Sequence, residues 1–166
     1  MNKNIKFLVM DVDGTLTDGK IYIGKEKELF KVFDVKDGYG IKDILPQYGI
    51  IPIIITARYS KILENRCKEL NICYLYQGIK DKLRKLNEII ELKSIEDRKK
   101  YSYINFAYIG DDLPDLECMA IIKENDGLVA CPADAIKKIK EISNYICSNN
   151  AGNGAVREFI EKIIEY

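Results

Sequence analysis

Residues 6–18 read KFLVMDVDGTLTD, a short apolar run that ends in two aspartates. The run Phe7–Met10 is continuously apolar, which is typical of a strand buried on both faces of a parallel sheet. Alternation sends Asp11 and Asp13 to the same side, and Gly14 lets the chain turn sharply after them. Two carboxylates this close favour a cation between them, and hard oxygen ligands suit Mg²⁺. The stretch therefore predicts a site for phosphate chemistry, with a solvated turn as the alternative for an isolated acid pair.

The composition predicts one domain, residues 1–166, with one active site. The 166 residues suffice for one ample core. Lys plus Arg and Asp plus Glu both number 26, so no bulk positive charge favours nucleic acid or an anionic membrane. Because the chain has no histidine, it holds no Ser-His-Asp triad, Cys-His dyad or His-ligated zinc. We therefore expect carboxylates and lysines to act on a small partner, with no nucleic acid and no membrane bound.

The cysteines are odd in number and form no C-x-x-C pair, which argues against a disulfide framework and a zinc ribbon. Four of the five lie within or beside apolar segments and are expected to be small core residues. The five cysteines are Cys67, Cys73, Cys118, Cys131 and Cys147. No segment approaches the ~18 apolar residues of a membrane span. These features predict a soluble protein of a reducing cytoplasm.

Predicted strands and helices alternate along the rest of the chain. Apolar runs predict further strands at residues 50–55, 73–76, 104–109, 128–131 and 145–147. Helical spacing predicts helices at 37–48, 60–70, 80–92, 116–119, 135–142 and 155–164. Residues 20–33 alternate around a charged centre and predict a projecting β-hairpin, and residues 93–102 predict a surface helix or loop. The pattern favours an α/β fold with one open, doubly wound parallel sheet.

Helix boundaries follow from capping residues and breakers. Asp37 is expected to cap the helix at 37–48, Gly49 to stop it, and Pro46 to end or kink it. Ser60 is expected to cap the helix that follows the second strand of the sheet.

A second acidic cluster, GDDLPD at residues 110–115, follows another predicted strand. The carboxyl ends of parallel strands meet at one edge of a sheet, so this cluster is expected beside Asp11 and Asp13. Three carboxylates with phosphate oxygens and water can fill the octahedral shell of Mg²⁺. The alternative is a helix N-terminus at which the acids complement the helix dipole.

The string DVDGTLT resembles the first motif of the haloacid dehalogenase superfamily, and GDDLPD resembles its fourth. The resemblance implies that Asp11 is the phosphoryl-accepting nucleophile and Asp13 the general acid and base. It implies that Asp111 is a metal ligand, so Asp11, Asp13 and Asp111 are the expected Mg²⁺ site. Asp112 and Asp115 are further candidates that support it.

Two more positions resemble superfamily motifs. Thr56 follows a strand, as does the second-motif residue whose hydroxyl binds a transferring phosphoryl oxygen. Lys82 lies early in a predicted helix and resembles the third-motif cation that neutralises the phosphoryl group, although Lys80 is open as an alternative. The implied fold is Rossmann-like.

A narrower resemblance covers nearly the whole chain. The ordered strings DVDGTLTDG, VKDGYGI, TAR, YQGIKDKL, GDDLPD, PADA and GNGAVRE resemble the 3-deoxy-D-manno-octulosonate 8-phosphate phosphatase family. This implies an enzyme of lipopolysaccharide biosynthesis without a cap domain, and a phosphomonoesterase that uses Mg²⁺. It also implies that Arg58, Gly78 and Arg157 bind the sugar-acid phosphate. The departures are Ala57 and Ala151, where relatives often have glycine, and a long segment at residues 93–102.

Three other functions are weighed against this one. A phosphatase of a nine-carbon keto-acid 9-phosphate shares the catalytic motifs but tends to have an acid at the position of Arg58, whose guanidinium suits a substrate carboxylate. Arg58 could instead be a surface residue paired with Glu64 or another acid. A catalytically silent oligomerisation module would lack Asp11, Asp13 or Lys82, and none is lost. A two-component receiver lacks D-G-T directly after an acid pair.

The last expectation is a homo-oligomer, and the family resemblance implies a homotetramer in which the hairpin forms the core and the tail approaches an adjacent site. The hairpin at residues 20–33 would expose apolar side chains unless another copy covers it. The glycine-containing segment at residues 149–154 could reach a neighbouring site, with Arg157 available to bind an anion.

Overall fold

The apolar run near the start of the chain forms β1 (Phe7–Met10), a central strand with all four residues buried. In the computed structural model, which describes residues 5–165, β1 belongs to a six-stranded sheet of order β5-β4-β1-β6-β7-β8. Each neighbouring pair is parallel. The other strands are β4 (Ile51–Ile55), β5 (Tyr74–Tyr76), β6 (Phe106–Ile109), β7 (Leu128–Cys131) and β8 (Tyr145–Ile146). The predicted parallel α/β fold is confirmed.

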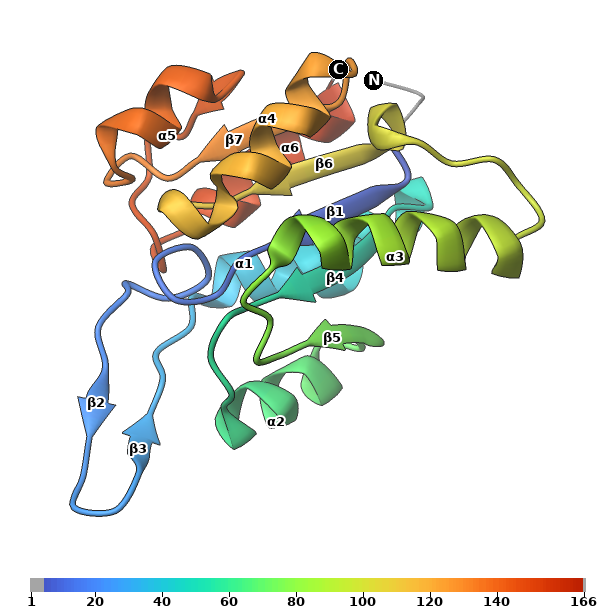
Figure 1. The fold of residues 1–166 in the computed structure, drawn as a ribbon. Coiled ribbons are helices and arrows are strands. Elements are labelled where there is room, and N and C mark those ends of the chain that lie inside the picture. Colours follow the sequence, from blue (N-terminus) through green and yellow to red (C-terminus); the bar gives the residue numbers. More distant parts are fainter. Residues whose placement is uncertain (1–4, 166) are drawn as a thin grey trace.

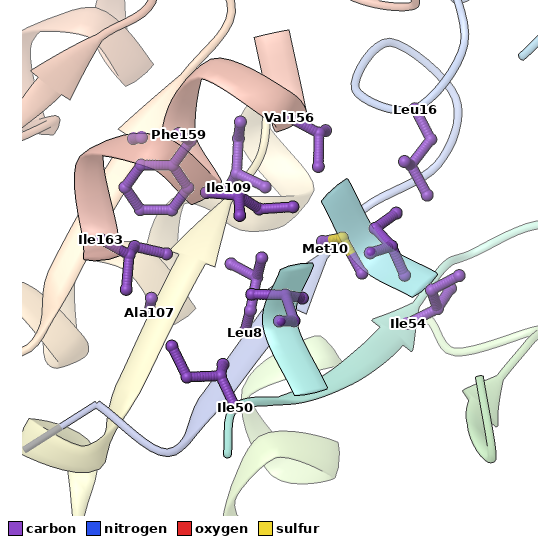
Figure 2. Close-up of a cluster of buried hydrophobic side chains, with 14 of the residues drawn as sticks. Leu8, Met10, Leu16, Ile50, Ile54, Ala107, Ile109, Val156, Phe159 and Ile163 are labelled. Atoms are coloured by element: carbon purple, nitrogen blue, oxygen red, sulfur yellow. The ribbon is translucent and has the colours of Figure 1, made fainter. Parts of the chain in front are cut away.

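Helices cover both faces of this sheet (Figure 1). One face carries α1 (Val35–Tyr39), α2 (Lys61–Glu69) and α6 (Ala155–Glu165), and the other carries α3 (Lys82–Glu96), α4 (Leu116–Glu124) and α5 (Lys137–Ile142). Figure 2 shows Leu8 and Met10 of β1 packed with Phe159 of α6 in the first cluster. Phe7 and Val9 point to the second cluster. Side-chain alternation in β1 thus serves two cores, which is why the run is apolar throughout.

The segment predicted as one helix at 37–48 is three short pieces. After α1, a π-helical turn, η1 (Gly40–Ile44), leads into a 3₁₀ turn, η2 (Leu45–Tyr48), which ends at Gly49 with φ 66°. Pro46 lacks an N–H and cannot continue an α-helical ladder, so the predicted break is confirmed.

The capping residue of α1 differs from the prediction. Asp34, not Asp37, accepts the N–H groups of Lys36 and Asp37. Asp37 is 2% exposed and accepts the backbone N–H of Arg157 at 2.7 Å, so it ties α1 to α6. Either aspartate has the chemistry of a cap, and the tertiary contact decides between them.

The polar stretch at residues 93–102 divides between helix and connection. Helix α3 begins after its cap Asp81 and continues to Glu96, beyond the predicted end. Lys93 is 4% exposed and donates to Tyr74 of β5 at 3.0 Å, and it pairs with Glu96 and Asp97. Another 3₁₀ turn, η3 (Tyr103–Asn105), precedes β6.

The predicted hairpin is also present. Strands β2 (Tyr22–Ile23) and β3 (Glu28–Phe30) pair only with each other and project from the sheet (Figure 1). All five cysteines are free thiols; Cys73 is exposed and the other four are buried. Within residues 5–165, no helix has both the length and the apolar character needed to cross a bilayer.

Candidate active site

The two acidic motifs meet at the carboxyl edge of the sheet because β1 and β6 are neighbours. Asp11 follows β1 and donates its N–H to Ile109, the last residue of β6, at 3.1 Å. One carboxylate oxygen from each of Asp11, Asp111 and Asp115 lies within 4.8 Å of the others. The chain turns from one half of the sheet to the other at this position, where open α/β sheets bind their ligands.

Two glycines make room for these carboxylates. Gly14 has φ 97°, and a Cβ atom there would lie 2.6 Å from Cγ of Asp111. A Cβ atom on Gly110 would lie 2.6 Å from Oδ2 of Asp115. Both contacts are closer than van der Waals packing allows, so a side chain at either position would displace an acid of the cluster.

Lys82 joins the same cluster from the start of α3. Its Nζ lies 2.8 Å from Oδ1 of Asp11 and 2.7 Å from Oδ1 of Asp115, and its side chain is 2% exposed. Lys80, the alternative from the sequence, is exposed. Burial lowers the pKa of Lys82, but Asp11 and Asp115 raise it more, so the ammonium stays charged beside the acids.

Asp115 is surrounded by donors. Its Oδ1 accepts the Tyr108 hydroxyl at 2.8 Å as well as Lys82, and its Oδ2 accepts the backbone N–H of Asp111 at 3.2 Å and of Asp112 at 3.4 Å. Asp112 instead caps η4 (Leu113–Asp115) by accepting the N–H of Leu113. The sequence did not indicate Tyr108, because a tyrosine inside an apolar strand looks like any core residue.

The acids at the strand ends repel one another. Burial, followed by the charge of Asp115, raises the pKa of Asp11 to about 6 although Lys82 lowers it. Burial, followed by the charges of Asp11 and Asp115, raises the pKa of Asp111 to about 7, and the Thr15 hydroxyl at 3.1 Å from Asp111 opposes the shift. A buried set of hard oxygens with excess negative charge fits Mg²⁺, which would neutralise that charge.

Asp13 lies outside the group of three acids and pairs with cations. Its Oδ1 pairs with Lys31, which follows β3, and its Oδ2 lies 3.5 Å from Nε of Arg58. Arg58 also lies 3.6 Å from Glu28 of the hairpin. It does not pair with Glu64, which pairs with Lys61 instead. The sequence did not indicate Lys31, because nothing local shows that the hairpin base folds back onto Asp13.

Thr56 and Gly78 lie in adjoining loops at the same edge. Thr56 follows β4 and is 2% exposed, and its backbone donates to Tyr76 and accepts from Ile79, both at 3.0 Å. Gly78 has φ 70° and donates its N–H to the carbonyl of Arg58 at 3.2 Å. Gly78 therefore shapes the loop that presents Arg58.

Arg157 has other partners. Its Nε donates to Glu161 at 2.7 Å, and its guanidinium lies 5.5 Å from the centre of the Tyr39 ring. None of the contacts found for Arg157 among residues 5–165 is with the acidic cluster.

The segment at residues 149–154 packs on its own chain. Gly152 has φ 63° and donates its N–H to the Thr15 carbonyl at 3.2 Å, and a Cβ there would lie 2.6 Å from the backbone N of Asp18. Ala151 is 5% exposed. The segment therefore buttresses the first-motif loop, which limits its freedom to reach elsewhere.

No protein-family model matches the chain. Curated proteins do: it is 40% identical over 162 residues to the 3-deoxy-D-manno-octulosonate 8-phosphate phosphatase of Salmonella typhi, covering 98% of this chain and 80% of that protein. The Yersinia pestis protein of the same name is 39% identical over 161 residues, covering 97% and 80%.

Solved structures agree in fold and sequence. The crystal structure of the Yersinia pestis phosphatase has a TM-score of 0.87 and 39% identity, covering 99% of this chain and 83% of that one. The Moraxella catarrhalis phosphatase, in complex with a magnesium ion, a phosphate ion and a KDO molecule, has a TM-score of 0.86 and 38% identity, covering 99% and 88%. The chain belongs to the 3-deoxy-D-manno-octulosonate 8-phosphate phosphatase family, within the haloacid dehalogenase superfamily.

Proposed function

We propose that this chain is a Mg²⁺-dependent phosphomonoesterase that hydrolyses 3-deoxy-D-manno-octulosonate 8-phosphate to the free sugar acid and phosphate. The observation that carries the proposal is the cluster of buried Asp11, half-buried Asp111 and buried Lys82, in which acids and a cation meet at one sheet edge. Membership of the phosphatase family supports the substrate. A silent oligomerisation module is disfavoured because it has no need of this charged cluster.

Each step of the proposed reaction is assigned to a residue of the site. The Asp11 carboxylate attacks phosphorus, the new P–O bond forms as the ester P–O bond breaks, and Asp13 gives its proton to the departing alcohol oxygen. Asp13 then takes a proton from the water that hydrolyses the aspartyl phosphate, which releases phosphate and restores Asp11. Lys82 neutralises phosphoryl charge throughout, and the Thr56 hydroxyl is proposed to bind a phosphoryl oxygen.

The proposed metal ligands are Asp11 and Asp111, with Asp13 beside the ion rather than bound to it. When bound, Mg²⁺ supplies positive charge that offsets the phosphoryl oxygens. The pairing of the Asp13 carboxylate with Lys31 and Arg58 favours its acid-base role over direct ligation. Asp115, with donors on both oxygens, is proposed to hold Lys82 and the backbone of Asp111 and Asp112 in place.

Arg58 is proposed to bind the substrate carboxylate. Gly78 and the Arg157 of a neighbouring copy are proposed to complete the substrate-binding site. The Arg58 side chain is 48% exposed at the rim of the site, so it is open to a ligand. A nine-carbon keto-acid 9-phosphate is the alternative substrate, and it calls for different contacts at this position.

We also propose that residues 1–166 form one domain, that the protein is cytoplasmic, and that it is a homotetramer. The hairpin supports the oligomer: Ile23 is 72% exposed and Leu29 is 61% exposed, and Val35 beside it is 79% exposed. Apolar side chains this exposed on a projecting arm favour burial against other copies.

The test is phosphate release from a panel that includes the octulosonate 8-phosphate, a nine-carbon keto-acid 9-phosphate and ribose 5-phosphate, with Mg²⁺ and with chelator. The expected result is a kcat/KM at least about tenfold higher on the octulosonate 8-phosphate, lost with chelator. A preference for the nine-carbon substrate would replace the proposed substrate with its rival.

A further inference from the structure

We propose that Lys31 is a positioning residue that holds Asp13 in line with the departing alcohol, so that the hairpin base forms part of the acid-base machinery of each chain. The inference rests on the proposed role of Asp13 in phosphomonoester hydrolysis. Lys31 lies directly after β3, and nothing in its sequence surroundings marks it for chemistry.

The Lys31 ammonium is buried between two carboxylates. It pairs with Oδ1 of Asp13 and lies 3.0 Å from Oε1 of Glu28, and its side chain is only 3% exposed. A buried ammonium persists only when it is paired, because its desolvation is costly. The pairing therefore fixes the positions of Lys31 and of the Asp13 carboxylate together.

Arg58 differs from Lys31 in its exposure. Its side chain is 48% exposed and its Nε lies 3.5 Å from Asp13, which is beyond a good hydrogen bond. Arg58 can turn to a substrate without leaving Asp13 unpaired, because Lys31 remains. The structure thus assigns the two cations different roles: Lys31 positions Asp13, and Arg58 contacts the substrate.

A second contact fixes the hairpin base itself. Oε2 of Glu28 accepts the Ser60 hydroxyl at 2.6 Å, and Ser60 caps α2 at the end of the loop that carries Thr56 and Arg58. Glu28 therefore links Lys31 to the rigid part of the site. These contacts lie within one chain, so the positioning needs no neighbouring copy.

The chemistry gives a readout that a general folding role would not change. When Asp11 attacks, the leaving alkoxide of an alkyl phosphate needs the proton that Asp13 supplies, whereas p-nitrophenolate leaves well without one. A displaced Asp13 should therefore slow alkyl esters far more than aryl esters. The value of kcat/KM isolates this step, since it reports events up to departure of the alcohol.

The experiment compares Lys31→Met with wild type on ribose 5-phosphate and p-nitrophenyl phosphate. We expect kcat/KM to fall about 100-fold on ribose 5-phosphate and less than about threefold on the aryl ester. Lys31→Arg should recover ribose 5-phosphate hydrolysis to within about tenfold of wild type. Lys27→Met, an exposed lysine of the same hairpin, should change both values less than about twofold.

Equal losses on the two esters, or no loss on either, would overturn the proposal. If circular dichroism shows that Lys31→Met is unfolded, Glu28→Gln and Lys31→Arg provide the same comparison: each should lower the alkyl value more than the aryl value, and equal losses again overturn it. If the wild-type enzyme cleaves ribose 5-phosphate but not the octulosonate 8-phosphate, only the proposed substrate is refuted. The losses of kcat/KM in Lys31→Met on ribose 5-phosphate and on p-nitrophenyl phosphate would still test the role of Lys31.

Discussion

The strand-end cluster and the hairpin differ in how they are held. Asp11 and Asp111 follow strands that pair along their length, and Lys82 reaches them from α3 with 2% of its side chain exposed. The two hairpin strands pair only with each other, and Ile23 at the hairpin is 72% exposed. The sheet edge thus carries the proposed nucleophile, whereas the hairpin contacts Asp13 through Lys31 at its buried base and exposes apolar side chains beyond it. Mutations at the strand-end acids and at the exposed hairpin should therefore have different effects.

The largest effect is expected from Asp11→Asn, which removes the proposed nucleophile and a charge of the cluster. Activity on every phosphate ester should fall by at least about 10⁴-fold in a phosphate-release assay. Asp126→Asn is the matched control, because Asp126 is exposed and its φ of 63° suits asparagine. Turnover by Asp11→Asn within about tenfold of wild type on any ester would refute the role of the strand-end acids.

A smaller but still large effect is expected from Gly14→Ala. The new Cβ would collide with the Asp111 carboxyl, so Mg²⁺ affinity and kcat/KM should each fall about 100-fold. Gly49→Ala separates collision from strain, since Gly49 has φ 66° and a Cβ atom added there would meet nothing within 4 Å. If both variants lose the same Mg²⁺ affinity in calorimetric titrations, the close approach of Gly14 to Asp111 is not needed for Mg²⁺ binding.

Arg58→Ala tests the part of the site that faces the hairpin, where Arg58 lies 3.6 Å from Glu28. Loss of one charged contact to a substrate carboxylate should lower kcat/KM about 30-fold on the octulosonate 8-phosphate and less than about threefold on p-nitrophenyl phosphate. Arg84→Ala, an arginine with 73% of its side chain exposed, should behave as wild type. A uniform loss across both substrates would place Arg58 with the reacting groups instead.

The pH dependence of Mg²⁺ binding tests the charge crowding at the strand ends. The pKa of Asp11 is raised to about 6 and that of Asp111 to about 7, so protons compete with the metal below pH 7. The Mg²⁺ affinity measured by calorimetry should be nearly constant above pH 8 and about twentyfold weaker at pH 6. The exposed control Asp43→Asn should leave this profile unchanged, and equal affinities at pH 6 and pH 8 would contradict the raised pKa values.

The smallest effect on chemistry is expected from Ile23→Lys at the exposed hairpin. The charge should reduce the mass measured by light scattering below that of a tetramer, while kcat/KM on p-nitrophenyl phosphate changes less than about twofold. Glu26→Lys puts the same side chain at another exposed hairpin position and should leave the mass unaltered. A wild-type monomer would end the proposal of an oligomer.

The same two regions show what a sequence can and cannot predict. Asp11 and Asp111 could be placed together, because each follows a buried strand and parallel strands end at one edge. The positions of Lys31 and Tyr108 could not, because each depends on a tertiary contact with an acid far along the chain. Arg157, which the family resemblance assigns to substrate binding, contacts Tyr39 of α1 and Glu161 of α6 within its own chain. Its role in substrate binding stays a prediction.

Local signals also failed where tertiary packing decides between equal options. Asp34 and Asp37 both have the chemistry of a helix cap, and only the contact of Asp37 with the backbone of Arg157 separates them. Helix α3 continues through a polar stretch because Lys93 folds onto Tyr74 of β5, a contact that helical periodicity does not encode.

The central claim is that one buried acid cluster at the sheet edge makes this chain a metal-dependent phosphatase of the octulosonate 8-phosphate. The most direct test is phosphate release from that substrate by the purified chain, first with Mg²⁺, then with chelator, then with Mg²⁺ restored. We predict rapid release, its loss with chelator, and its full return. Release that persists in chelator, or none from this substrate at any Mg²⁺ concentration, would contradict the account.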